Sequence, residues 1–237
     1  MEVSDVQSSR PLGRFERVIS PLLVIGSLAF SLGYVALAIS GWGWDDWRGF
    51  LDSVPRDCVC SGVVALFVGT FLFGCNVSFG RRDHAGNNWI FPVMLIVGLA
   101  LGWTCGHDER RNLHTLGGQW IADLGAVLFL AGTVLRIAAV RTLGPRHSVW
   151  VAVQDNHQLV TTGLYRFVRH PSYVGALLAV FGWALAFRSV AGLLLALLIL
   201  PPILTRIRAE ERLLMEEFGD TYRTYQRRSW RVLPLIY

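Results

Sequence analysis

The sequence predicts an all-α, polytopic membrane protein with about six transmembrane helices, the last two forming a hairpin. The 237 residues are 53% hydrophobic and only 16% charged, whereas soluble domains carry about 25% charged residues. Several apolar runs approach or exceed the roughly 18 residues that a helix needs to cross a bilayer. These observations exclude a disordered chain, a secreted disulfide scaffold and an ordinary cytosolic enzyme.

The expected spans follow one another along the chain. The first starts near the N-terminus and is longer than the apolar core of a signal peptide, so we interpret it as a retained span. The last two are short and are separated only by Arg188 and Ser189, which predicts the hairpin. Tryptophans near several proposed ends are typical of membrane interfaces. The six segments are Val18–Ile39, Val59–Phe79, Trp89–Cys105, Trp120–Val140, Val174–Phe187 and Val190–Thr205.

The arginines orient these spans. All 22 basic residues are Arg, and with the N-terminus in the cytosol sixteen of them fall on the cytoplasmic side and five on the other side. This bias predicts that both termini are cytoplasmic. The net charge of +5 fits cationic loops facing anionic membrane lipids, and we expect no nucleic-acid partner. The four cysteines form no CxxC pair, so we expect no metal site.

Polar, aromatic and histidine residues concentrate after Arg136. We therefore divide one integrated membrane domain into N-terminal transmembrane helices, 1–134, and a C-terminal functional region, 135–237. An ionisable residue within a span is a functional-site hypothesis, because an unpaired charge there costs several kcal/mol. The alternative for Arg136 is snorkelling towards the nearby cytoplasmic interface.

The segment from Gly163 to Gly175 contains the motif Arg169-His170-Pro171-Ser172-Tyr173. Proline favours the first turn of a helix, so His170, Ser172 and Tyr173 are expected around a helix N-terminus at the membrane surface. Such an end attracts anionic groups, including carboxylates. The alternative is that His-Pro is only a capping turn.

A third feature follows Pro201-Pro202, where we expect a break and then a helix that leaves the membrane. Arg206 and Glu210 are spaced i, i+4 and should share one face. The alternative is an exposed ion pair worth less than about 1 kcal/mol. Further along, Phe218-Gly219 leads to Tyr222 and Tyr225, and a final Arg cluster fits an anchor on anionic lipid.

Together, the RHPSY-VG run, the later R-x-x-x-E-E and the F-G-x-x-Y-x-x-Y that follows resemble the isoprenylcysteine carboxyl methyltransferase family. The resemblance covers roughly residues 135–234. It implies that the C-terminal segments form a cytoplasmic pocket for S-adenosyl-L-methionine, and that Arg136 and Arg206 face the methyl acceptor. The residues it assigns to the cofactor are Gln154, His157, Gln158, Leu159, Val160, Tyr165, His170, Pro171, Ser172, Tyr173 and Glu210.

Methyl transfer depends mainly on positioning and desolvation. A carboxylate acceptor needs no general base but does need a cation to orient it. We therefore expect transfer to a lipophilic or prenylated acceptor from the bilayer, with a prenylcysteine-like carboxylate favoured. The alternatives are a phospholipid amine or small thiol as acceptor, a sterol-reductase-like oxidoreductase with a nicotinamide cofactor, or a non-catalytic lipid-binding protein. The last of these would use Gly98-x-x-x-Gly102 as a packing motif.

Overall fold

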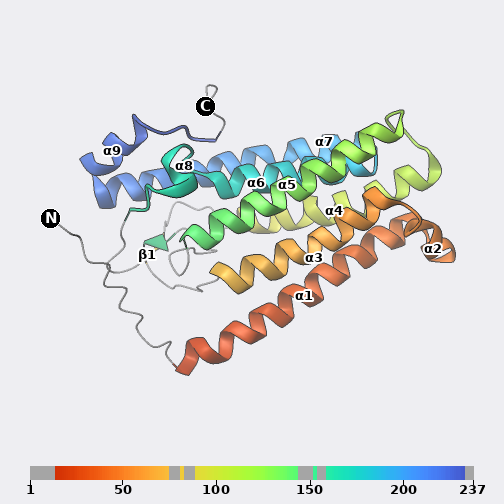
Figure 1. Cartoon of the computed structure of the whole chain (residues 1–237), viewed down its shortest axis with the longest axis horizontal. Coiled ribbons are helices and arrows are strands. Elements are labelled where there is room, and N and C mark those ends of the chain that lie inside the picture. The colour runs from red at the N-terminus through yellow and green to blue at the C-terminus, as the bar shows by residue number, and fades with distance from the viewer. Residues whose placement is uncertain (1–13, 75–80, 83–88, 144–151, 154–158, 233–237) are drawn as a thin grey trace.

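The computed structural model describes residues 14–74, 81–82, 89–143, 152–153 and 159–232. These residues form a helical bundle (Figure 1). Two short strands, β1 (Arg81–Arg82) and β2 (Ala152–Val153), pair antiparallel beside it. The helices are α1 (Arg14–Trp42), η1 (Trp44–Asp46), α2 (Trp47–Phe50), α3 (Val54–Gly74), α4 (Ile90–Arg111), α5 (Gln119–Leu143), η4 (Gly163–Arg166), α6 (Pro171–Ala186), α7 (Val190–Leu198), α8 (Leu200–Phe218) and α9 (Asp220–Gln226).

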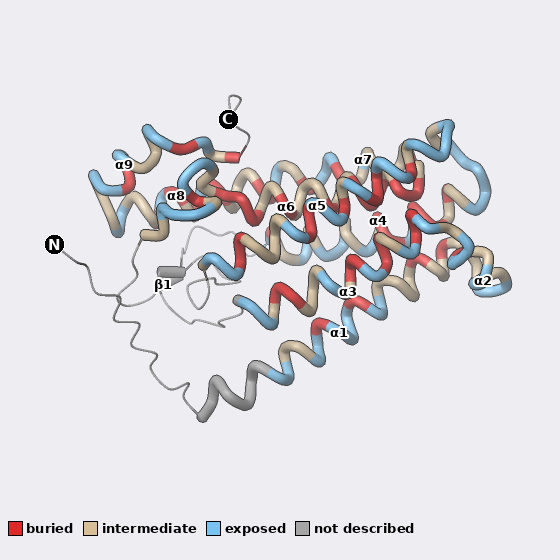
Figure 2. The backbone as a smooth tube through the Cα atoms, viewed as in Figure 1, coloured by how far each residue is buried: buried red, intermediate tan, exposed pale blue. Residues whose placement is uncertain are grey.

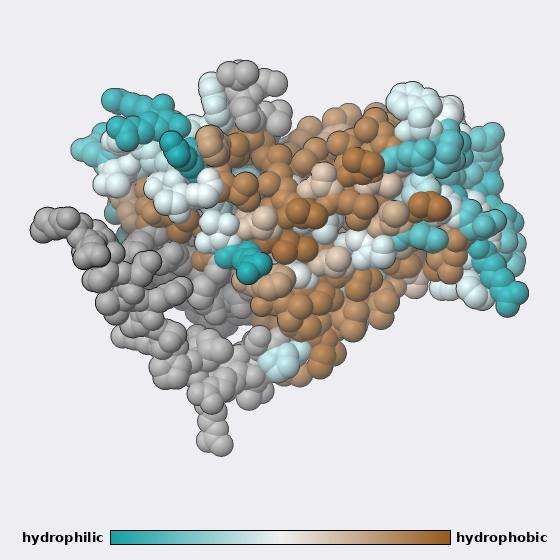
Figure 3. All heavy atoms as spheres, viewed as in Figure 1, coloured by the Kyte–Doolittle hydropathy of each residue, from teal (hydrophilic) through white to brown (hydrophobic). Residues whose placement is uncertain are grey.

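The helices confirm the predicted class of membrane protein. Five segments are long and apolar enough to cross a membrane, the last of them combining α7 and α8, and α6 is a shorter apolar helix. The hydrophobic surface forms a band between two polar ends (Figure 3). The α6–α7 turn at Arg188 and Ser189 makes the predicted hairpin.

Three predictions of where helices begin, end or break need correction. Helix α3 begins at Val54, five residues before the predicted start, and α4 continues to Arg111, six residues past the predicted end at Cys105. Proline is tolerated in the first helical turn, and Pro201 and Pro202 lie in the first turn of α8. Only Ile199 separates this helix from α7, so the prolines begin the long helix instead of breaking it.

The membrane helices enclose a central space. Helix α1 packs on both α3 and α4, α3 packs on α5, and α5 packs on α6. Helices α7 and α8, which follow α6 in the chain, both contact α4 and so close the ring of helices. Figure 2 shows buried residues along α5 and α6, whereas much of α1 is exposed. This ring positions one face of every spanning element towards a common interior.

The α5–α6 pair is the most extensive helix contact in the ring. Four glycines, Gly125 and Gly132 on α5 and Gly175 and Gly182 on α6, place one backbone against the other. A β-carbon at Gly175 would lie 2.6 Å from the Arg136 backbone nitrogen. In lipid, burial of apolar surface does not drive helices together. Small residues favour association there because they let two helix backbones approach closely. The contact fixes Arg136 next to the first turn of α6.

Helices α1 and α4 also meet through glycines. A β-carbon at Gly106 would lie 2.2 Å from the Ala38 carbonyl oxygen, and one at Gly102 would lie 3.0 Å from the Tyr34 ring. Gly98 has open space around it, so the expected Gly98-x-x-x-Gly102 packing motif is wrong at Gly98. The tight α1–α4 contact lies at Gly106, one turn beyond Gly102 in α4.

A buried charge cluster closes the end of the bundle where α4 ends and α6 turns into α7, here called the far end. The Glu109 carboxylate lies 3.1 Å from Arg56 Nη1 and 3.3 Å from Arg188 Nη2. Ser189 donates a 2.6 Å hydrogen bond to Asp108. Because buried charges require partners, this cluster ties α3 and α4 to the α6–α7 turn.

Candidate active site

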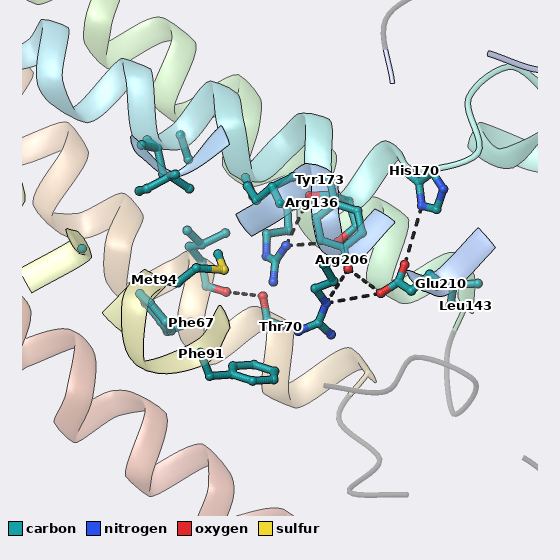
Figure 4. A pocket seen from close by; sticks show the side chains of 18 of the residues that line it. Phe67, Thr70, Phe91, Met94, Arg136, Leu143, His170, Tyr173, Arg206 and Glu210 are labelled. Atoms are coloured by element: carbon teal, nitrogen blue, oxygen red, sulfur yellow. Dashed lines mark hydrogen bonds and ion pairs between the residues drawn. The ribbon is translucent and has the colours of Figure 1, made fainter. Parts of the chain in front are cut away.

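The opposite end of the bundle, the site end, carries the polar groups singled out in the sequence. Arg136 projects from α5 towards α6, where its Nη1 donates to the Ser172 backbone oxygen at 3.3 Å and to Ser172 Oγ at 3.2 Å. Among the residues that the structure describes, no carboxylate lies within ion-pair distance of Arg136. The side chain therefore points to uncharged oxygens in the first turn of α6, inside the bundle (Figure 4). This orientation differs from the snorkelling alternative.

A second group connects α6 with α8. Arg206 Nε donates to the Tyr173 hydroxyl oxygen at 2.6 Å and lies 3.3 Å from Glu210 Oε1. The Tyr173 hydroxyl in turn donates to Glu210. The Arg206 guanidinium also stacks over the Phe91 ring of α4, with its carbon 4.9 Å from the centroid. The predicted i, i+4 pair is thus confirmed as a part-buried group that tyrosine and phenylalanine hold in place.

His170 occupies the N-cap position of α6, with Pro171 in the first turn. The imidazole makes no capping hydrogen bond. Instead, its Nδ1 lies 3.6 Å from Glu210 and its Nε2 lies 3.4 Å from Glu211. The His-Pro motif therefore does more than cap the helix, because it brings a buried imidazole to the two carboxylates of α8.

Glu211 anchors this corner, although the sequence analysis assigned it no role. Its carboxylate is 2.8 Å from Arg169 Nε and 2.6 Å from Arg231 Nη2. Arg169 also donates to backbone oxygens of Gln226 and Ser229. These bonds fasten the C-terminal segment over the start of α6.

Backbone pairing completes the attachment of that segment. The Arg169 amide donates to the Trp230 oxygen at 2.8 Å, and the Trp230 amide donates to the Phe167 oxygen at 2.9 Å. Val232 is buried against Ile199, Ile203 and Ile207. The residues just after α9 are therefore part of the same folded unit as the site.

Two tyrosines line the outer edge of the site. Tyr225 of α9 donates a 2.6 Å hydrogen bond to the Tyr165 backbone oxygen, and Tyr165 donates to the Ala139 oxygen at 3.4 Å. Burial raises the pKa of Tyr225 to about 12. Because its ordinary pKa is about 10, the phenol is protonated at neutral pH and keeps its donor role.

One cavity of about 580 Å³ connects this polar end with the middle of the bundle. Nine of the predicted site residues line it: Arg136, Leu159, Val160, Tyr165, His170, Ser172, Tyr173, Arg206 and Glu210. Pro171 is buried beside the cavity and shapes the helix start. Gln154, His157 and Gln158 lie outside the described residues.

The inner part of the cavity is apolar and comes largely from helices to which the sequence analysis gave no site residue. Helices α1, α3 and α4 contribute side chains that only the three-dimensional packing brings together. In sequence they are ordinary members of apolar spans, so no local signal marks them. They include Phe30, Tyr34, Phe67, Phe71, Met94 and Leu99.

These features define a class of integral membrane protein: a helical bundle with a cavity that joins a charged, hydrogen-bonded end to an apolar interior. Comparisons with known proteins agree. The model of the isoprenylcysteine carboxyl methyltransferase (ICMT) family matches residues 125–216. A probable protein-S-isoprenylcysteine O-methyltransferase of Oryza sativa subsp. indica is 32% identical over 161 residues, covering 66% of this chain and 84% of that protein. The chain belongs to the isoprenylcysteine carboxyl methyltransferase family.

Two further relatives match over a shorter part of their length. The protein-S-isoprenylcysteine O-methyltransferase of Schizosaccharomyces pombe is 38% identical, over 44% of this chain and 46% of that protein. The Mus musculus enzyme is 34% identical, over 49% of this chain and 42% of that protein. The matched region thus spans less than half of these two relatives.

The fold is similar to a solved structure of the eukaryotic intramembrane Ras methyltransferase ICMT. The two share a TM-score of 0.53 at 19% sequence identity, over 88% of this chain and 75% of the other. At this identity the likeness concerns the fold.

Proposed function

We propose that this protein transfers a methyl group from S-adenosyl-L-methionine to the carboxylate of a prenylcysteine-like acceptor that arrives from the bilayer. The observation that carries the proposal is a continuous cavity, polar at the site end and apolar towards the middle of the bundle. Such a shape suits two reactants of opposite polarity. The curated relatives, which are named protein-S-isoprenylcysteine O-methyltransferases, support the same reaction.

The groups between α6 and α8 fit the methyl donor. When bound, S-adenosyl-L-methionine supplies an electrophilic methyl group on a sulfonium. Glu210 offers a carboxylate to the amino group or ribose hydroxyls, and the N-terminal end of α6 favours the donor carboxylate. Tyr165, Leu159 and Val160 line the outer part of the cavity and suit the adenine. His170 would hold Glu210 in position at 3.6 Å.

Arg136 is the better candidate to orient the acceptor carboxylate. Its hydrogen-bond partners, the Ser172 oxygens, are neutral, so its charge is available to an incoming anion. Arg206 lies against the Glu210 carboxylate and would shape the site beside Arg136. An ionised carboxylate attacks without a base, and the apolar interior excludes water from the reacting atoms.

The bias of arginines towards one side of the predicted topology supports a cytoplasmic site end and cytoplasmic termini. Residues 135–237 would carry the donor site, and residues 1–134 would complete the lipid chamber around it. The two parts would act as one unit, because α1, α3 and α4 line the same cavity as α6 and α8.

Calorimetry on the detergent-purified protein tests the donor assignment. We expect one-site binding of S-adenosyl-L-methionine and none of NADPH. Loss of a hydrogen bond to a charged group costs about 1.5–3 kcal/mol, so Glu210→Gln should weaken binding about 10- to 100-fold. Glu216→Gln, which changes an exposed carboxylate on the same helix, is the matched control. Binding of NADPH alone would favour a reductase, and no binding by folded protein would favour a non-catalytic role.

A further inference from the structure

An exposed group of aromatic and basic side chains lies on the loop before α6 and on the segment after α9. Phe167 is 64% exposed and Trp230 is 43% exposed. The guanidinium carbon of Arg166 lies 5.8 Å from the centroid of the Phe167 ring, and Arg227 and Arg228 are exposed just before Trp230. We call Arg166, Phe167, Arg227, Arg228 and Trp230 the arginine–aromatic patch.

Backbone hydrogen bonds join the two halves of the patch. The Trp230 amide donates to the Phe167 oxygen at 2.9 Å, and the Arg169 amide donates to the Trp230 oxygen at 2.8 Å. The Arg169 guanidinium crosses the same junction to reach the backbone oxygens of Gln226 and Ser229. The patch is therefore a fixed surface of the folded protein.

The patch lies where the apolar part of the bundle begins. The His170 amide donates to the Arg231 oxygen at 3.2 Å, so Arg231 is level with the N-terminal end of α6. The next residue, Val232, is buried in the same apolar cluster as Ile207 of α8. Trp230 comes two residues before Val232 and thus lies at the boundary of this apolar part. Exposed aromatic side chains at such a depth are typical of a membrane–water interface.

The distribution of charge favours an anionic partner on the membrane side of the patch. Its arginines are exposed, and each arginine near an anionic membrane surface contributes about fivefold in affinity. The exposed acidic residues Glu216 and Glu217 lie further from the bundle, because α8 continues for about 9 Å between Glu211 and Glu217 at about 1.5 Å per residue. The patch therefore suits the headgroups of anionic phospholipids.

The patch is also attached to groups that we assign to the methyl donor. Arg231, which directly follows Trp230, lies 2.6 Å from Glu211. Glu211 lies 3.4 Å from His170 Nε2, and His170 Nδ1 lies 3.6 Å from Glu210. A displacement of the segment after α9 would therefore be transmitted to the Glu210 carboxylate.

Resting on the function proposed above, we propose that the arginine–aromatic patch binds anionic phospholipid headgroups and that this binding strengthens the binding of the methyl donor. Lipid contacts at Trp230 and the neighbouring arginines keep the segment after α9 on the start of α6. The segment then holds Arg231 on Glu211, which keeps Glu210 in position for the donor. Because a coupling between two binding sites acts in both directions, the donor should in turn stabilise this segment.

Hydrogen exchange tests the lipid contact without the donor. Protein in nanodiscs of phosphatidylcholine would be compared with protein in nanodiscs of an equimolar mixture of phosphatidylcholine and phosphatidylglycerol. Amides of residues 226–232 should exchange at least about fivefold more slowly in the anionic mixture. The double variant Arg227→Gln/Arg228→Gln should lose most of this difference. Arg48→Gln/Arg111→Gln, which makes the same charge change at exposed positions of the far end, should keep it.

Calorimetry in the same nanodiscs tests the coupling to the donor. Coupling between two sites typically changes an affinity by about 5- to 150-fold, so S-adenosyl-L-methionine should bind at least about fivefold more tightly in the anionic mixture. For Arg227→Gln/Arg228→Gln the two lipid compositions should give nearly equal affinities, whereas the far-end control should behave as the wild type.

Equal exchange rates in the two lipid compositions would overturn the proposal. Protection by a soluble polyglutamate peptide, but not by phosphatidylglycerol, would identify an acidic protein as the partner and would also overturn it. Slower exchange with an unchanged donor affinity would refute the coupling. If the wild type binds no S-adenosyl-L-methionine in either composition, the proposed function fails, whereas the exchange rates still decide whether the patch binds lipid.

Discussion

At the scale of single residues, the site contrasts two arginines with different surroundings. Arg206 lies against a carboxylate and a phenol that belong to the protein. Arg136 bonds only neutral oxygens among the described residues, although a charge in a spanning helix is costly without a partner. The arrangement is understandable if an anionic substrate completes the coordination of Arg136 during turnover.

Replacing Arg136 tests this interpretation. Arg136→Gln keeps a hydrogen-bond donor for Ser172 but removes the charge, so kcat/KM for a prenylcysteine should fall about 10- to 100-fold. Arg136→Lys should recover only part of the loss, because an ammonium lacks the planar fork of guanidinium. Binding of S-adenosyl-L-methionine, measured by calorimetry, should stay within about twofold. Arg141→Gln, an exposed arginine further along α5, is the control; an equal loss there would contradict a specific role.

The polar residues of the site could be predicted because they occur in short motifs. Arg206 and Glu210 have helical spacing, and His170-Pro171 marks a helix start. Glu211 is the last residue of the R-x-x-x-E-E motif, but its anchoring role could not be predicted because its partners Arg169 and Arg231 come from distant segments. Tyr34 and Trp183 are likewise unremarkable within apolar spans. Only the three-dimensional packing brings these two rings together, with their centroids 5.0 Å apart.

At the scale of elements, the α5–α6 contact determines where the site residues lie. Its glycines allow backbone contact along both helices, and Gly175 lies directly against Arg136. The sequence predicted both helices but not their contact, because glycines are frequent in spans and their partners depend on helix rotation. The early start of α3 was missed for a different reason. The predicted span begins only after the charged residues Arg56 and Asp57, yet Arg56 is buried with Glu109 and backbone oxygens as partners.

Two glycine substitutions should have opposite effects on stability. Gly175→Leu places side-chain atoms where the α5 backbone lies, and overpacking of this kind costs about 1–3 kcal/mol or more. Gly98→Ala meets open space, and alanine is favoured over glycine in a helix by about 1 kcal/mol. Thermal unfolding in detergent should show a lower Tm for Gly175→Leu and an unchanged or higher Tm for Gly98→Ala. The reverse order would contradict the packing described here.

At the scale of the whole molecule, the ring of helices separates two chemically different ends. The site end carries the polar part of the cavity, and the far end is closed by aromatic rings and the Arg56–Glu109–Arg188 cluster. Successive spans run in opposite directions, so both ends of the described chain lie at the same end of the bundle (Figure 1). The arginine bias, which is visible in the sequence, predicts that this side is the cytosol.

Cysteine labelling tests this orientation. In a variant without the four native cysteines, Thr224→Cys on exposed α9 should react with a membrane-impermeant maleimide only after intact cells are permeabilised. Asn112→Cys, in the exposed turn after α4, should react without permeabilisation. The opposite labelling pattern would place the site on the other side of the membrane.

The most direct test of the central claim is the chemical nature of the methylated product. The purified protein would be incubated with S-adenosyl-L-methionine labelled in the methyl group and with N-acetyl-S-farnesylcysteine. We predict label in the acceptor that mild alkali releases as methanol, because a carboxyl methyl ester is hydrolysed under those conditions. Because the amine of this acceptor is acetylated and its sulfur is alkylated, label that resists alkali would contradict methylation of the carboxylate. Absence of transfer by protein that binds the donor would contradict prenylcysteine methylation.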